Sequence, residues 1–164
     1  MAAGDMIKNR FQEFTDEQTG TRVVRLTTAD GSHLLYCAEI GGERQLYLMD
    51  LASGDAVQLT EGEGLDDYGG LIAADDKHIF YQQEQAIWKL SLETLERECV
   101  YRIPEGWNGG NWGMSEDNRF LAIVETRRDS LPEKKKGANW DFFAITCKAK
   151  PHCRIVYCDL QTGS

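Results

Sequence analysis

A strand-and-turn unit recurs along this chain, and its spacing limits the possible folds more than any other feature of the sequence. An acidic turn followed by an apolar run begins three times, at Asp30, Asp75 and Glu116. The starts are 45 and then 41 residues apart. Repeats of about 40 to 50 residues that hold several short strands are typical of β-propellers, whose blades are four-stranded antiparallel sheets. The spacing therefore predicts an all-β fold made of β-propeller blades.

The second repeat contains sequence for all four strands of a blade. We expect an inner strand at 69–74, then strands at 78–82, 86–92 and 95–101, before Pro104, which cannot donate to a strand ladder. By the same reasoning the chain is one partial propeller domain over 1–164. Its expected blade units are about 28–60, 61–101 and 102–164.

The first and third repeats each lack sequence for one strand. Fourteen residues precede the second and third turns, at 61–74 and 102–115, whereas two residues separate Thr27 from Asp30. The segment 19–27 is similar to an outer strand of the kind that latches a closed ring. We therefore expect about three blades of a propeller, incomplete at both ends. Unpaired sheet edges of this kind favour self-association.

Charge and hydropathy restrict the partners of the chain. The net charge is −9, but the part from Glu125 onward holds 8 basic and 5 acidic residues. An acidic chain without a recognised nucleic-acid fold is not expected to bind nucleic acid. No apolar stretch approaches the roughly 18 residues that span a membrane, and no signal peptide is visible, so we expect a cytoplasmic protein. The basic C-terminal part suits a small polyanion.

Cysteine and histidine are placed in ways that favour structural roles. The five cysteines include no CxxC pair, which argues against a disulfide framework or a tight zinc site. The chain has three histidines, and His33 and His78 occupy equivalent turn positions of the repeat. His152 lies among basic residues, and with Cys153 it leaves a weaker metal-ligand alternative open. We expect no catalytic residue and no metal ligand in this chain.

Several stretches of the sequence resemble bacterial oligogalacturonate lyases, in order and over nearly the whole chain. They are Thr19, Gly20 and Thr21 with Val23–Thr27; Gln58–Gly62; Val100 and Tyr101 with Ile103–Glu105 and Trp107; Glu125–Arg128; and Lys150 and Pro151 with Cys153, Arg154, Asp159, Leu160, Thr162 and Gly163. The chain resembles only about the N-terminal two-fifths of that family. It departs from it after Thr27, where the family has an inner strand with a Cys-His-Arg run.

The resemblance implies a seven-bladed propeller that splits short pectin fragments by β-elimination in the cytoplasm, with Mn²⁺ in the complete enzyme. It also implies that a cluster of histidines with a glutamine holds the metal and that a histidine aided by an arginine is the base. All of these residues belong to later blades, and their motifs are not present in this sequence. By this comparison we expect no metal to be bound by this chain and no cleavage by this chain alone.

The basic residues near the C-terminus are the candidate substrate-binding residues. They are Arg127, Arg128, Lys150 and Arg154, with Lys148 close by, and they flank a long insertion that would border the cleft of a complete ring. An arginine fork can bind both oxygens of a carboxylate. Trp112 is a further candidate, because its expected inner strand lines the central channel. The alternative is a solvated loop with ion pairs to Glu125 and Asp129.

Two other readings of the whole chain stay open at this point. Propeller blades often serve as protein-binding scaffolds, so the chain could be a non-catalytic interaction module. It could also be the product of a decayed reading frame. The missing inner strand favours a truncated lyase or a decayed frame over an interaction module.

Overall fold

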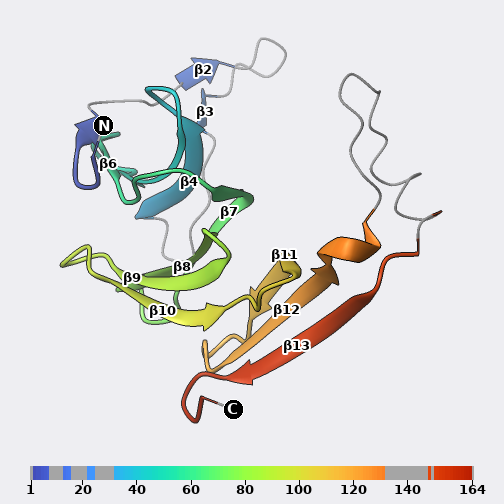
Figure 1. Cartoon of the computed structure of the whole chain (residues 1–164). Helices are drawn as coiled ribbons and strands as arrows, with labels where there is room; N and C mark the ends of the chain where they lie inside the picture. Colours follow the sequence, from blue (N-terminus) through green and yellow to red (C-terminus); the bar gives the residue numbers. More distant parts are fainter. Residues whose placement is uncertain are drawn as a thin grey trace. The chain divides into compact units, whose positions relative to one another are not determined.

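The computed structural model describes residues 2–7, 13–15, 22–24, 32–131, 148 and 150–163, and strands dominate that part of the chain (Figure 1). The strands are β1 (Met6–Ile7), β2 (Glu13–Thr15), β3 (Arg22–Val24), β4 (His33–Glu39), β5 (Arg44–Asp50), β6 (Ala56–Gln58), β7 (Leu65–Ile72), β8 (His78–Gln83), β9 (Ala86–Ser91), β10 (Arg97–Arg102), β11 (Trp107–Met114), β12 (Phe120–Arg127) and β13 (Cys153–Asp159). A short 3-10 helix, η1 (Arg128–Ser130), follows β12. The predicted all-β class is confirmed.

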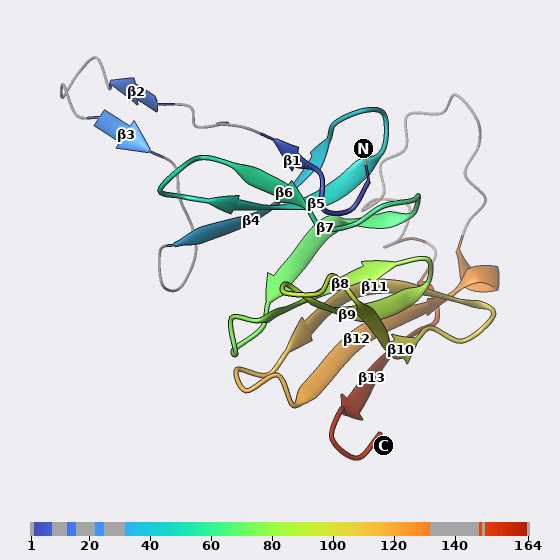
Figure 2. The same ribbon diagram turned by 90° about the vertical axis from the view of Figure 1, so that its left-hand side faces the viewer.

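The strands form three larger sheets and one hairpin (Figure 2). The first sheet has the order β1-β6-β5-β4, the second β10-β9-β8-β7 and the third β11-β12-β13, while β2 pairs with β3. In the second and third sheets, strands that follow one another along the chain lie side by side, as they do in a propeller blade. The first sheet differs, because β1 joins it beside β6 from the N-terminal side of the chain.

The chain divides into two compact units. The first comprises residues 1–84 with 88–98, and its core lies between the first and second sheets. The fully or almost fully buried members of that core are Leu46, Leu59, Leu65, Ile79, Tyr81 and Leu90. Gly70 allows this close packing, because a Cβ there would lie 2.9 Å from the Phe80 carbonyl oxygen and 3.2 Å from Leu46 Cδ1. A glycine within a strand often marks such an approach.

The second unit comprises residues 85–87 with 99–164 and has a separate core. Its buried members are Ile87, Ile103, Leu121 and Ile123, and its half-buried neighbours include Trp107, Trp112, Val156 and Cys158. The side chains of Leu121 and Ile123 alternate with Ala122, which is exposed, so one face of the third sheet forms this core.

Backbone hydrogen bonds define the repeat spacing. Equivalent 2.8 Å bonds close the middle hairpin of each sheet, from Leu51 to Ser32, from Leu92 to Lys77 and from Leu160 to Arg119. The accepting residues are 45 and 42 positions apart. The second predicted spacing, 41, is therefore wrong by one residue: Asp117, and not Glu116, takes the place of Asp75 and accepts a backbone N–H two residues later. A shift of one residue exchanges the two faces of a strand.

Most predicted strands have somewhat different bounds in the structure; the strand expected at 95–101, for example, is β10 at Arg97–Arg102. The sequence also favours an inner strand at 110–115 in the third repeat, equivalent to 69–74 in the second. Both strands begin earlier in the structure, as β7 and β11, and each has a register shift of the bulge type within its pairing. The expected latch strand at 19–27 is described only at 22–24, where it pairs with β2; residues 19–21 and 25–27 lie outside the described part. None of the helices among the described residues is both long and apolar enough to span a bilayer.

Candidate functional site: the basic end of the third sheet

Three strand ends meet at one end of the third sheet, where β11 begins, β12 ends and β13 begins. Trp107 pairs with Arg127, and Glu125 pairs with Arg154, in the antiparallel ladders. Since side chains of directly opposed residues lie close together, this register gathers basic and aromatic groups from distant parts of the sequence. We call this group the basic end; it consists of Trp107, Asn108, Arg127, Arg128 and Arg154.

A buried carboxylate holds Arg154 in place. Glu125 is 0% exposed, and its Oε2 accepts hydrogen bonds from Arg154 Nε at 2.8 Å and Nη2 at 2.7 Å. Its other oxygen, Oε1, accepts a 2.6 Å hydrogen bond from the Tyr101 hydroxyl. Burial, together with this bond to a carboxylate, raises the pKa of Tyr101, so the phenol stays protonated and donating. Both oxygens of the buried carboxylate are thus satisfied.

The guanidinium of Arg154 also stacks on an aromatic ring. Its central carbon lies 4.0 Å from the centroid of Trp107, and His152 meets the same ring edge-on, with centroids 5.8 Å apart. A cation over a tryptophan face is attracted by the ring quadrupole. Arg154 is therefore fixed on two sides, while its side chain remains 43% exposed. This geometry leaves part of a pre-oriented guanidinium open to solvent.

The two arginines at the end of β12 have different partners. Arg128 Nε donates to the Trp107 carbonyl oxygen at 3.2 Å and to Asn108 Oδ1 at 2.8 Å, so it carries no acidic partner among the contacts of the described residues. Arg127 is ion-paired with Asp129, whose pKa that arginine lowers. Two of the ion pairs expected for a solvated loop, to Glu125 and to Asp129, are therefore present.

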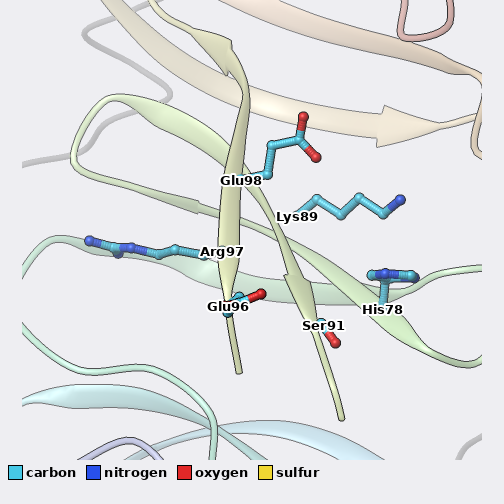
Figure 3. Close-up of a pocket in the computed structure, with 6 residues that line it drawn as sticks. All are labelled: His78, Lys89, Ser91, Glu96, Arg97 and Glu98. Atoms are coloured by element: carbon cyan, nitrogen blue, oxygen red, sulfur yellow. The ribbon is translucent and has the colours of Figure 1, made fainter. Parts of the chain in front are cut away.

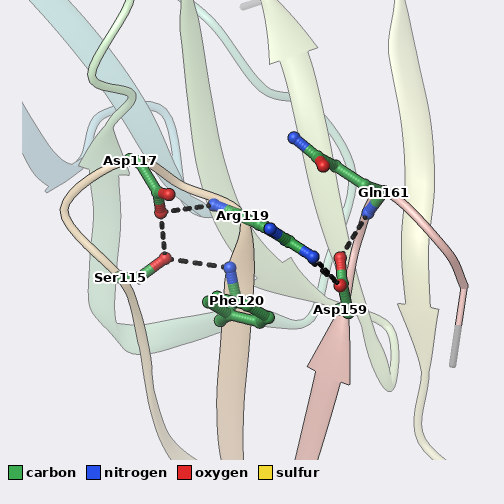
Figure 4. A network of polar contacts seen from close by, with 6 residues as sticks. All are labelled: Ser115, Asp117, Arg119, Phe120, Asp159 and Gln161. Atoms are coloured by element: carbon green, nitrogen blue, oxygen red, sulfur yellow. Dashed lines mark hydrogen bonds and ion pairs between the residues drawn. The ribbon is translucent and has the colours of Figure 1, made fainter.

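The opposite end of the same sheet has a closed polar network (Figure 4). There Arg119 donates to Asp159 Oδ2 through Nη2 at 2.7 Å and through Nε at 3.1 Å. Asp159 Oδ1 also accepts the backbone N–H of Gln161. This arginine has the same type of partner as Arg154, but it carries no aromatic stack of the same closeness and its carboxylate is not fully buried. It provides a natural reference for the basic end.

The remaining candidates lie in less favourable places. Trp112 packs against the core of the second unit and pairs with Ile123, at the position where the second sheet has Gly70. Lys148 and Lys150 are exposed, and most of the segment between η1 and Lys150 lies outside the described residues. The structure thus brings Arg127, Arg128 and Arg154 together and places Trp112 in packing.

The three histidines lie at three separate places. His33 Nδ1 hydrogen-bonds the Ser32 hydroxyl, His78 Nδ1 lies 2.6 Å from Asp75 Oδ2, and His152 packs on Trp107. Among the described residues, no group of three or more His, Cys, Asp or Glu side chains is arranged to hold a metal ion. These residues do not fit the histidine cluster that the resemblance implies for manganese.

A shallow pocket on the second sheet is a weaker candidate (Figure 3). It is lined by His78, Lys89, Ser91, Glu96, Arg97 and Glu98. Arg97 already donates to Gln83 and stacks over Trp88. The two glutamates would repel a polyanion, so the pocket suits an acidic ligand less well than the basic end.

Sequence reasoning did not foresee the roles of Tyr101 and Glu125. Glu125 was expected only as an ion-pair partner in a solvated loop, whereas it is fully buried under Arg154. The ladder that brings these groups together joins β12 to β13 across more than twenty intervening residues. A pattern of neighbouring residues in the sequence cannot predict such a strand register.

Comparison with known proteins agrees with this fold. A family model described as oligogalacturonate lyase matches residues 1–164. The oligogalacturonide lyase of Pectobacterium atrosepticum and the oligogalacturonate lyase of Dickeya dadantii are each 32% identical to this chain, over 99% of it and 46% of their own length. The chain therefore spans about half the length of the curated relatives it matches.

Solved structures give the same result. The oligogalacturonate lyase of Vibrio parahaemolyticus matches with a TM-score of 0.83 and 33% identity, over 99% of this chain and 47% of its own. An oligogalacturonate lyase in complex with manganese matches with a TM-score of 0.84 and 34% identity, over 100% and 48%. TolB from Acinetobacter baumannii, at 0.59 and 19%, over 92% and 35%, shares the fold alone. The chain belongs to the oligogalacturonate lyase family.

Proposed function

We propose that this chain acts in the splitting of oligogalacturonate by β-elimination, and that its basic end binds carboxylates of that substrate. The family relationship supports the substrate class, since relatives that match 99% of the chain are named for it. We also place the protein in the cytoplasm, as the resemblance implies. The alternatives of an interaction module or a decayed reading frame predict no binding of uronides.

One observation carries the proposal: Arg154 is oriented by a buried carboxylate and an indole ring while part of it stays exposed. Galacturonate units carry a carboxylate, for which a guanidinium is the matching partner. Because Glu125 and Trp107 fix the arginine before a ligand arrives, little side-chain entropy is lost on binding. Arg128, next to Trp107, adds a second positive charge at the same end.

The chemistry of elimination defines what this chain supplies and what it lacks. A base removes the proton from the carbon next to the carboxylate, a carbon–carbon double bond forms, and the bond to the glycosidic oxygen breaks. A cation on the carboxylate lowers the barrier, because negative charge builds up there as the proton leaves. Arg154 and Arg128 would neutralise or position a carboxylate. A base would have to come from elsewhere, because His33 and His78 are turn residues and His152 packs on Trp107.

Binding of digalacturonate to the pure chain tests the proposal by isothermal titration calorimetry. We expect binding that weakens with added salt, and no binding of the neutral digalactose. Arg154→Gln should weaken binding about tenfold, since a hydrogen bond to a charged group contributes about 1.5–3 kcal/mol.

The matched control for this substitution is Arg119→Gln, at the opposite end of the same sheet. It removes the same charge and an ion pair of similar length, so it should leave the affinity within about twofold of the parent. Equal losses in the two variants would mean that only net charge matters and would contradict a site at the basic end. Self-association through free strand edges is also part of the proposal, and sedimentation of the pure chain measures it.

A further inference from the structure

The buried carboxylate of Glu125 is divided between two partners. Tyr101 lies near the end of β10, belongs to the second unit and packs against its core, so the position of its ring is fixed. Its hydroxyl donates to Glu125 Oε1 at 2.6 Å. Arg154 meets the other oxygen: Nε donates to Oε2 at 2.8 Å, and Nη2 lies 2.7 Å from the same atom. One oxygen thus serves the phenol and the other serves the guanidinium.

An arginine and a carboxylate commonly pair in another way. In that arrangement two parallel N–H donors bind one oxygen each. This chain has such a pair at Arg127, whose Nε donates to Asp129 Oδ1 at 2.9 Å while Nη2 donates to Oδ2. Within the described residues, the Asp129 carboxylate accepts no hydrogen bond from any other side chain. The parallel fork is therefore the arrangement that forms when both oxygens are available to the arginine.

The opposite end of the same sheet has the divided arrangement (Figure 4). Arg119 approaches one oxygen of Asp159, with Nη2 2.7 Å and Nε 3.1 Å from Oδ2. The second oxygen, Oδ1, accepts the backbone N–H of Gln161 at 2.9 Å. In two separate pairs, a donor on one carboxylate oxygen thus goes together with a guanidinium on the other oxygen. At the basic end, that donor is the Tyr101 hydroxyl.

The divided arrangement leaves a defined part of Arg154 for a ligand. A guanidinium carries one N–H donor on Nε and two on each terminal nitrogen. Glu125 engages the side formed by Nε and Nη2, and no contact among the described residues engages Nη1. The side chain is 43% exposed, and the Trp107 ring holds its face at 4.0 Å. The edge between Nη1 and Nη2 can therefore offer two parallel donors to a carboxylate.

We propose that Tyr101 is a positioning residue of the carboxylate site: acting through Glu125, it sets the orientation in which Arg154 presents this edge to a uronate. The inference rests on the proposed function of the basic end. Without the hydroxyl, Glu125 Oε1 is free to accept one of the two arginine donors, and the pair turns into the parallel fork. The guanidinium turns with it, so its edge has to be realigned when a carboxylate binds, and affinity is lost.

Proton–nitrogen NMR of the arginine side chains tests the orientation of Arg154 without a ligand. Its Nε–H signal is assigned by the loss of that signal in Arg154→Gln. We expect Tyr101→Phe to shift the Arg154 signal and to leave the Nε–H signal of Arg119 unchanged, since Gln161 still holds Asp159. An unshifted Arg154 signal in the folded variant overturns the proposal, whether or not the chain binds uronides.

Calorimetric titration with digalacturonate tests the effect on binding. Tyr101→Phe should weaken binding about three- to tenfold, the range expected for one hydrogen bond. In the background of Arg154→Gln, the same substitution should change the affinity by less than about twofold, because Tyr101 acts only through Arg154. A purely structural role of the phenol predicts the same loss in both backgrounds. That result, or no loss in either background, overturns the proposal.

Tyr47→Phe is the matched control, because it removes another phenol hydroxyl that donates to a side-chain oxygen, Gln58 Oε1 at 3.1 Å, in the first unit. It should leave the affinity within about twofold of the parent. If the parent chain binds no digalacturonate, the proposed function fails, while the NMR shift still decides the role of Tyr101. If Tyr101→Phe does not fold, Glu125→Gln is measured in the parent and in Arg154→Gln. An equal loss in both, or no loss in either, overturns the link through Glu125.

Discussion

Glu125 and Arg154 face each other across β12 and β13. Glu125 is fully buried, whereas the side chain of Arg154 is 43% exposed. This asymmetry decides what each substitution does. Removing the Arg154 side chain leaves the buried Glu125 carboxylate with the Tyr101 hydroxyl as its remaining side-chain partner. Removing the charge of Glu125 leaves an arginine that water can reach. Glu125 and the Trp107 ring together orient Arg154, and the Tyr101 hydroxyl satisfies the second oxygen of the carboxylate.

Arg154→Met should destabilise the chain by about 2 kcal/mol, because breaking a buried ion pair costs about 3–5 kcal/mol and partial exposure reduces that figure. In the background of Glu125→Gln the same substitution should cost less than about 1 kcal/mol, since no buried charge is left behind. Urea unfolding of the four proteins measures the coupling. Arg127→Met is the control, and loss of its exposed ion pair with Asp129 should change the free energy of unfolding far less than Arg154→Met does.

Gly70→Ala should destabilise the first unit by about 1–3 kcal/mol, the usual cost of overpacking. The added Cβ would lie 2.9 Å from the Phe80 carbonyl oxygen, which is backbone and cannot move aside easily. Gly113→Ala is the matched control, because a Cβ at Gly113 has no neighbour within 4 Å. It should be neutral or stabilising by less than about 1 kcal/mol. If thermal unfolding shows the same stability for Gly70→Ala and Gly113→Ala, the packing described for Gly70 is contradicted.

The raised pKa of Tyr101 predicts a loss of stability at high pH. Burial and the hydrogen bond to Glu125 favour the neutral phenol in the folded chain. A group whose pKa is higher in the folded state contributes stability below its unfolded pKa, about 10 for tyrosine, and loses it as the pH rises further. Unfolding free energies of Tyr101→Phe should therefore fall less than those of the parent above about pH 10. Parallel curves for the two proteins would show that Tyr101 does not titrate in this way.

The ion pair of Arg119 with Asp159 should make the stability of the chain fall at low pH. Its hydrogen bonds lower the pKa of Asp159 in the folded chain. A lowered pKa contributes stability above the unfolded value, about 4 for aspartate, and that stability is lost as the pH falls through the folded pKa. Asp159→Asn should flatten the acid side of the stability curve below about pH 4. Glu105→Gln, an exposed residue of the loop before β11, should leave that part of the curve unchanged.

Repeat arithmetic on the sequence predicted the all-β class and most strands, because turns and alternating apolar residues are local signals. The family was predicted separately, from the resemblance of particular stretches of the sequence. Repeat arithmetic missed the second spacing by one residue, since Glu116 and Asp117 are both acidic. What distinguishes Asp117 is the pair of hydrogen bonds that it accepts, from the Ser115 hydroxyl and from the Arg119 backbone N–H. That single residue decides which face of β12 is buried. The roles of Tyr101 and Glu125 were beyond sequence reasoning. The position of Glu125 depends on the pairing of β12 with β13, and the role of Tyr101 depends on a hydrogen bond from β10 to β12.

Turnover of digalacturonate by the pure chain in the presence of Mn²⁺ tests the central claim most directly: this chain supplies carboxylate binding but no cleavage. The ultraviolet absorbance of the unsaturated uronide product is recorded beside the Dickeya dadantii lyase under the same conditions. We predict product from that relative and none from this chain. Product from this chain that a chelator abolishes would contradict the account, and Arg154→Gln and His152→Ala would then show which residues form the working site.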